Sequence, residues 1–125
     1  MELLNGEIYG AVNSLNQLFE KDWPIGVSLG LAKLLGKLNP THEAIEKVRA
    51  GLVAKNVPEG AREIKQGDEN WDKFMEEYFE LMTQKADQIV FKKVDIPSKV
   101  NGETVVVNPK ILIPLEKFIN VVDGE

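Results

Sequence analysis

Residues 15–38 read LNQLFEKDWPIGVSLGLAKLLGKL, and the spacing of apolar side chains in and around this segment sets the architecture. Upstream of Pro24, apolar residues recur at three- and four-residue steps from Ile8 to Phe19, which is typical of an amphipathic helix. Proline restricts the residue before it and has no backbone N–H group to donate. We therefore predict a helix at about residues 5–22 that ends before Pro24.

A second helix is predicted at about residues 25–38, because leucines give this segment a wide apolar stripe. Two helices joined by so short a turn should pack antiparallel, with Asn5 as the N-cap of the first. Two interpretations of Pro40 stay open. It begins a new helix at 40–55 behind the N-cap Asn39, or it kinks one long helix.

Three glycines, Gly26, Gly30 and Gly36, interrupt the apolar stripe. A glycine inside a helix costs about 1 kcal/mol relative to alanine, so a compensating reason is expected. Either another element approaches the helix closely at these positions, or the helix is locally loose.

The pattern changes again after these helices. Residues 56–68 lose the helical period and predict a mobile loop. The helical period returns at about residues 69–87, where three large aromatic residues share one face: Trp71, Phe74 and Tyr78. We predict a further helix there, at the centre of the core.

The C-terminal third predicts strands and short helical turns. Residues 88–107 shift toward an alternating pattern, and Asn101-Gly102 is the residue pair that a two-residue hairpin turn requires. Residues 104–107 supply the returning strand of this predicted hairpin. Residues 109–120 contain two prolines and predict one or two helical turns.

Together these segments predict an α+β fold for a single domain, residues 1–125. It comprises an antiparallel helical hairpin within a three- to four-helix bundle, then a C-terminal β-hairpin and terminal helical turns. A chain of 125 residues is long enough for one core of its own. Its 43% hydrophobic and 28% charged residues are ordinary for a globular protein.

Charge and hydropathy argue against nucleic acids and membranes as partners. The net charge is −5 with two arginines, Arg49 and Arg62, whereas phosphate binding depends on clustered Lys and Arg. No apolar run approaches the roughly 20 residues of a membrane span, and Lys33 and Lys37 are too few for a membrane-surface helix. We expect a cytoplasmic protein without a signal peptide, which the absence of cysteine suits.

The residue types that carry catalysis are sparse. His42 is the only histidine, and acid–base and metal sites most often combine histidine with further groups. We find no glycine-rich phosphate loop and no Gly-x-Ser-x-Gly elbow. The densest acidic group is interpreted as a solvated helix face: Glu76, Glu77 and Glu80. We therefore expect no catalytic, cofactor or metal site, and hence no enzyme.

Four phrases resemble a group of small uncharacterised proteins of tailed phages and prophages: Leu15–Leu18 (LNQL), Asp22–Ile25 (DWPI), Leu31–Leu38 (LAKLLGKL) and Leu112–Ile119 (LIPLEKFI). In that group a long helical hairpin precedes a polar loop, another helix and a strand. Pro40 departs from the continuous helix of the group. The resemblance implies a viral context, with the host cytoplasm as the location, and it assigns no catalytic residue.

From these observations we expect a non-enzymatic, phage-type interaction or assembly module that acts through a host or virion protein. The predicted helices carry more apolar surface than a small domain can hide, so a homo-oligomer is expected. The alternative is a small-molecule-binding or sequestering protein whose pocket is closed by residues 56–70. Its aromatic lining, which would also be the partner contact of the module, consists of Trp23, Trp71, Phe74 and Tyr78.

Overall fold

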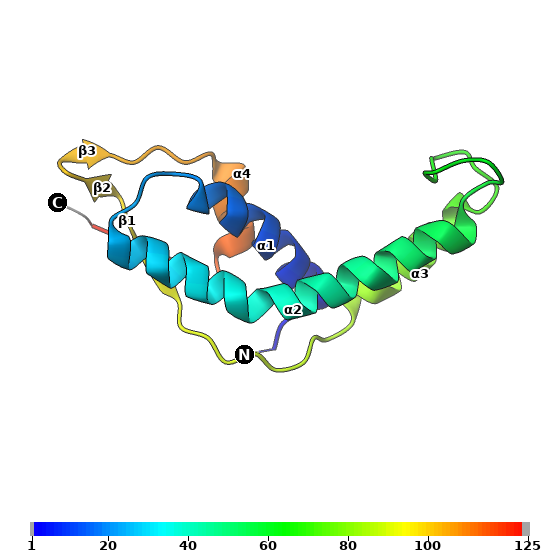
Figure 1. Cartoon of the computed structure of the whole chain (residues 1–125), viewed down its shortest axis with the longest axis horizontal. Coiled ribbons are helices and arrows are strands. Elements are labelled where there is room, and N and C mark those ends of the chain that lie inside the picture. Colours follow the sequence, from blue (N-terminus) through cyan, green and yellow to red (C-terminus); the bar gives the residue numbers. More distant parts are fainter. Residues whose placement is uncertain (1, 124–125) are drawn as a thin grey trace.

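A computed structural model describes residues 2–123 of the chain (Figure 1). In chain order the elements are α1 (Asn5–Phe19), α2 (Ile25–Asn56), α3 (Trp71–Thr83), β1 (Val94–Pro97), β2 (Lys99–Val100), β3 (Glu103–Thr104), α4 (Pro109–Leu112), the 3-10 helix η1 (Ile113–Leu115) and β4 (Ile119–Val122). The prediction of an α+β fold, with packed helices followed by C-terminal strands, is confirmed.

The long helix α2 organises the molecule. α1 packs antiparallel against its first half, and α3 packs against its second half, so that α1 and α3 follow one another along α2 (Figure 1). Asn5 joins the two short helices, because its backbone N–H donates to Gln84 O at 2.9 Å and its Nδ2 donates to Leu81 O at 3.0 Å. The prediction of Asn5 as N-cap is thus wrong; Leu4 holds that position.

Pro40 lies inside α2 and does not end it. The predicted pair of helices, 25–38 and 40–55, is one helix, and the kink interpretation is the correct one. Pro40 cannot donate a hydrogen bond to the carbonyl four residues earlier, and its ring crowds that carbonyl; Figure 1 shows α2 bending near its middle. The helix continues because Leu38 and Ile45, on either side of the bend, both remain buried.

Both short helices are shorter than predicted. α1 ends at Phe19 instead of about residue 22, and α3 spans Trp71–Thr83 instead of 69–87. Beyond α3 the chain pairs with the N-terminal segment, where Ala86 N donates to Leu3 O at 2.8 Å. This pairing with a distant segment replaces the helical hydrogen bonds that the sequence pattern predicted. Residues 57–70 contain no helix or strand, as expected for the loop.

The predicted hairpin at 88–107 is correct in its turn and wrong in its extent. Asn101 and Gly102 have φ angles of 54° and 80°, as a type I′ turn requires. Only β2 and β3 flank this turn, with two paired residues each: Lys99 opposite Thr104 and Val100 opposite Glu103. Residues 105–107 form no strand.

The main strand pairing is parallel and joins β1 to β4, with Val94 opposite Ile119 and Ile96 opposite Val121. Residues 119–120, predicted as helical turn, therefore belong to a strand, whereas α4 and η1 confirm the turns before it. The pairing is favoured by the core: Val94, Ile96 and Ile119 are each at most 8% exposed. The hairpin, α4 and η1 form the crossover that a parallel pair needs.

The core lies between α1, the first half of α2, the β1–β4 pair and η1. Its fully buried members include Ile8, Leu15, Leu18, Leu31, Leu38, Leu115 and Phe118. No helix within residues 2–123 combines the length and the apolar character needed to cross a membrane.

Glu7 on α1 forms an ion pair with Lys117 near the C-terminus. This pair makes the free energy of unfolding depend on pH. The Glu7 carboxylate accepts from Leu4 N and lies 2.5 Å from Lys117 Nζ, and the Lys117 ammonium, then the Leu4 N–H, lower the pKa of Glu7 below 4.5. A carboxyl group whose pKa is lower in the folded chain than in the unfolded chain stabilises the fold at pH values above its unfolded-state pKa. This stabilisation is lost as the pH falls through the folded-state pKa.

Glu7→Gln should therefore lower the free energy of unfolding at pH 7 by no more than about 1 kcal/mol, because the pair is partly exposed. The difference from wild type should shrink as pH falls below 4.5. Urea unfolding at stepped pH measures it. A difference that stays constant into strong acid would show that the ionised carboxylate contributes nothing.

Candidate functional site

The four aromatic residues predicted to line one pocket lie at two ends of the molecule. Trp23 precedes α2, and its Nε1 donates to Leu18 O at 2.8 Å. The other three lie on α3, which packs against the far end of α2. α2 has 32 residues, about 48 Å along its axis, and the two groups lie beside its opposite halves. The structure therefore does not form the predicted pocket of Trp23, Trp71, Phe74 and Tyr78.

The three aromatic residues on α3 form a cluster of their own. Phe74 is 6% exposed, and its ring centroid lies 6.0 Å from that of Trp71 and 5.8 Å from that of Tyr78. Asn56, the buried last residue of α2, links the two helices nearby, because its Nδ2 donates to Leu52 O at 2.9 Å and to Glu77 Oε1 at 3.4 Å. The three rings pack on one another, and the cluster stabilises the contact between α2 and α3.

A polar cluster lies where α1 meets α2. The Tyr9 hydroxyl donates to Glu46 Oε1, and the Tyr9 ring stacks on His42 with centroids 4.9 Å apart. The Glu46 carboxylate raises the pKa of Tyr9 to about 12, so the hydroxyl stays protonated at neutral pH and acts as a link between the helices. His42 is half-buried inside α2, with no partner for Nε2 among residues 2–123.

Within the described part of the chain, no group of three or more His, Cys, Asp or Glu side chains is placed to hold a metal ion. The three glutamates of the predicted acidic group on α3 have different surroundings. Glu77 pairs with Lys55 at 2.9 Å, whereas Glu76 and Glu80 are exposed.

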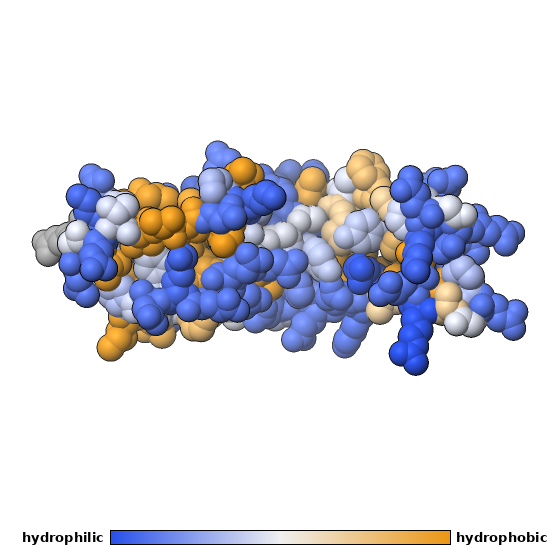
Figure 2. Space-filling view, turned by 90° about the horizontal axis from the view of Figure 1, so that it is seen from above, coloured by the Kyte–Doolittle hydropathy of each residue, from blue (hydrophilic) through white to orange (hydrophobic). Residues whose placement is uncertain are grey.

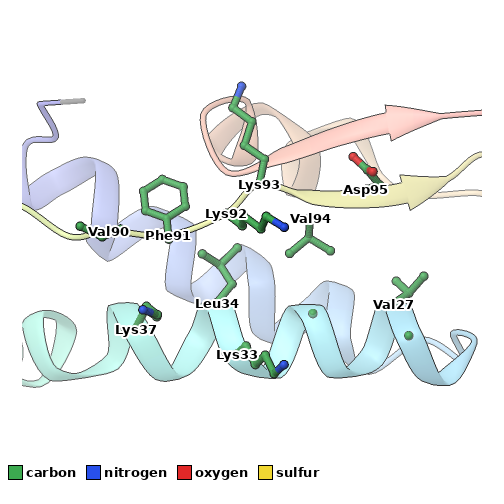
Figure 3. Close-up of a pocket in the computed structure, with 12 residues that line it drawn as sticks. Val27, Lys33, Leu34, Lys37, Val90, Phe91, Lys92, Lys93, Val94 and Asp95 are labelled. Carbon is green, nitrogen blue, oxygen red and sulfur yellow. The ribbon is translucent and has the colours of Figure 1, made fainter.

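An apolar groove of about 600 Å³ lies between the first half of α2 and the extended chain that leads into β1. Its walls are the α2 face from Gly26 to Lys37 and residues 90–95. Figure 3 shows Val27 and Leu34 on α2 and Val94 on β1 pointing toward one another across it. We call this feature the lysine groove, because four lysines border its apolar floor: Lys33, Lys37, Lys92 and Lys93.

Gly30 allows the two walls to approach. A Cβ atom at this position would lie 3.3 Å from Val94 Cγ1 and 3.6 Å from Val94 Cγ2, so the missing side chain is what admits β1 beside the helix. Of the two explanations for the helical glycines, close approach holds at Gly30. A Cβ atom at Gly26 or Gly36 would meet no atom of the described residues within 4 Å, and Gly26 faces the open groove.

The groove is basic on an acidic chain. All four lysines are exposed, and none of them forms a salt bridge within residues 2–123. The one acidic residue in the lining, Asp95, accepts from Asn120 Nδ2 at 3.2 Å. Figure 3 shows that Lys93 points away from α2, whereas Lys92 lies between β1 and α2.

Comparisons with protein-family models, curated proteins and solved structures found no match. The resemblance to phage proteins therefore stays a prediction, and the site rests on its geometry alone.

The sequence analysis did not predict this site, although it noted two of its lysines. It placed Lys33 and Lys37 four residues apart on the polar side of an apolar helix, a spacing that puts both on one face. It did not place Lys92 at the same groove, because residues 90–95 lie opposite α2 only through the packing of segments far apart in the chain.

Proposed function

We propose that the chain is a protein-interaction module whose lysine groove binds an acidic, amphipathic segment of a protein partner. The observation that carries this proposal is an apolar floor bordered by lysines that form no salt bridge within residues 2–123. Apolar side chains of the partner would gain from leaving water mainly at Val27 and Val90, because Leu34 and Val94 are already buried at the base of the groove. The carboxylates of the partner would meet the ammonium groups at the border. In the phage context that the resemblance implies, the partner is a host or virion protein, met in the host cytoplasm.

The form of the groove supports a macromolecular ligand. Val90 in its wall is 76% exposed, so a ligand seated there keeps one side in solvent, as a helix laid in a surface groove does. The volume of about 600 Å³ also lies within the range of small-molecule sites. This volume favours a second candidate, an anionic amphiphile such as a fatty acid, which the same lysines would bind through its carboxylate.

Fluorescence anisotropy with a labelled, designed helical peptide tests the proposal. The peptide presents Leu and Phe on one face and Glu on the others, and we expect binding that weakens as NaCl is raised from about 50 to 500 mM. Gly26→Leu would fill the groove and should weaken binding at least about tenfold, equal to about 1.4 kcal/mol. Gly51→Leu is the matched control, since Gly51 is also a helical glycine with open space around it.

Two further probes separate the alternatives. A peptide with Lys in place of Glu should not bind, and a fluorescent fatty acid should bind only if the small-molecule candidate is correct. Equal affinity of the Gly26→Leu and Gly51→Leu proteins for the acidic peptide would refute the groove as its binding site.

A further inference from the structure

The outer face of α3 carries apolar side chains that no other element within residues 2–123 covers. Met75 is 40% exposed and Phe79 is 69% exposed, although the opposite face of α3 packs on α2 through Phe74. On a helical projection the two residues lie beside Asp72, Glu76 and Glu80. We call these five residues the acidic ridge.

The carboxylates of the ridge are available for a partner. Asp72, Glu76 and Glu80 are exposed and form no salt bridge within residues 2–123. They recur every four residues, a rise of about 6 Å along a helix, which is also the separation of Lys33 and Lys37 on α2. The two surfaces therefore match in charge, in apolar character and in spacing.

The ridge and the groove lie at opposite ends of the molecule. α3 packs near the C-terminal end of α2, whereas the groove lies along its N-terminal half (Figure 1). Acidic side chains outnumber basic ones by eight to three between residues 59 and 80, and Figure 2 shows mainly hydrophilic side chains over that end and hydrophobic ones gathered toward the other. A ridge cannot reach the groove of its own chain, but it can reach that of another copy.

We propose that the acidic ridge of a second copy occupies the lysine groove, so that the protein assembles with itself through two different surfaces. This inference rests on the groove function proposed above and names the chain itself as the partner. A contact between different surfaces is heterologous, and it either closes on itself or extends into a chain of copies. The contact area of one helix face is small, so assembly is expected in the micromolar range and should decline with salt.

Charge reversal on each surface tests the pairing. Lys33→Glu/Lys37→Glu reverses the two groove charges on α2 and leaves Lys92 and Lys93, and Glu76→Lys/Glu80→Lys reverses two of the three ridge charges. All four positions are exposed, so folding, followed by circular dichroism, should be unchanged. By sedimentation velocity each variant alone should be monomeric at concentrations where wild type assembles. A 1:1 mixture should assemble again, because the intact ridge then meets the intact groove and the reversed ridge meets the reversed groove. A chain with all four changes should assemble for the same reason.

Two matched serine variants test the apolar part of the contact. Phe79→Ser should weaken assembly at least about tenfold, whereas Val106→Ser, at a position 77% exposed outside both surfaces, should leave it unchanged.

Wild type that stays monomeric at about 0.5 mM in low salt, well above the micromolar range, would overturn this inference. So would assembly that the charge reversals leave intact, or a mixture that remains monomeric. If the acidic peptide still binds the groove in that case, the proposed interaction function survives and only the identity of the partner fails. Loss of peptide binding as well would remove both proposals.

Discussion

Phe118→Ala should lower the free energy of unfolding by about 3–5 kcal/mol, the range for removing a buried aromatic ring. Phe118 is 1% exposed, and its ring lies 5.3 Å from that of Phe91, centroid to centroid. Its carbonyl accepts from Val94 N at 3.1 Å, so the ring sits where the β1–β4 pair meets the helical core. A loss of this size is a large share of the stability of a domain, typically about 5–15 kcal/mol.

Urea unfolding followed by circular dichroism measures the loss at constant protein concentration, which separates it from any effect of assembly. Ile113→Ala is the control, because Ile113 lies in the same segment and is 72% exposed. We expect a change within about 0.5 kcal/mol for the control. A loss below about 1 kcal/mol for Phe118→Ala would mean that this ring does not belong to the core.

Ile119→Lys should have a still larger effect and leave the chain unfolded or severely destabilised. Ile119 is 6% exposed and opposite Val94 in the parallel pair, and a lysine there would place an unpaired charge among apolar side chains. Val121→Lys provides the comparison within the same strand, since Val121 is 62% exposed. It should change the free energy of unfolding by no more than about 0.5 kcal/mol.

Circular dichroism and thermal unfolding of the two lysine variants measure this contrast. If both were tolerated equally, β4 would not be buried against the core through Ile119. If both unfolded the chain, the exposed face of β4 would be covered by another element or by another copy.

The sequence predicted best where structure depends on neighbouring residues. The apolar period fixes α1 and α2, and Asn101-Gly102 fixes the turn, because φ angles near those of type I′ turns are accessible to both residues. The same turn also led to a wrong prediction for the strands beside it. A strong local turn suggested that its flanks extend as long strands, but β1 gains more burial by pairing with β4.

The candidate site could be predicted only in part. Lys33 and Lys37 lie on one helix face, which the period shows directly. Lys92 joins them because Gly30 admits Val94 beside α2, and no local pattern signals that approach. The aromatic residues misled for a related reason: Trp23 and Trp71 share a residue type, but α2 holds them apart.

Pro40 has a consequence for any assembly of copies. It lies in α2 between the half that carries the groove and the half that supports the ridge, and the bend there fixes the direction in which one docking surface faces relative to the other. Each added copy would repeat that angle. A single imino acid, touching neither surface, would thus set the curvature of the whole array and decide whether it closes into a ring or grows as a helical fibre.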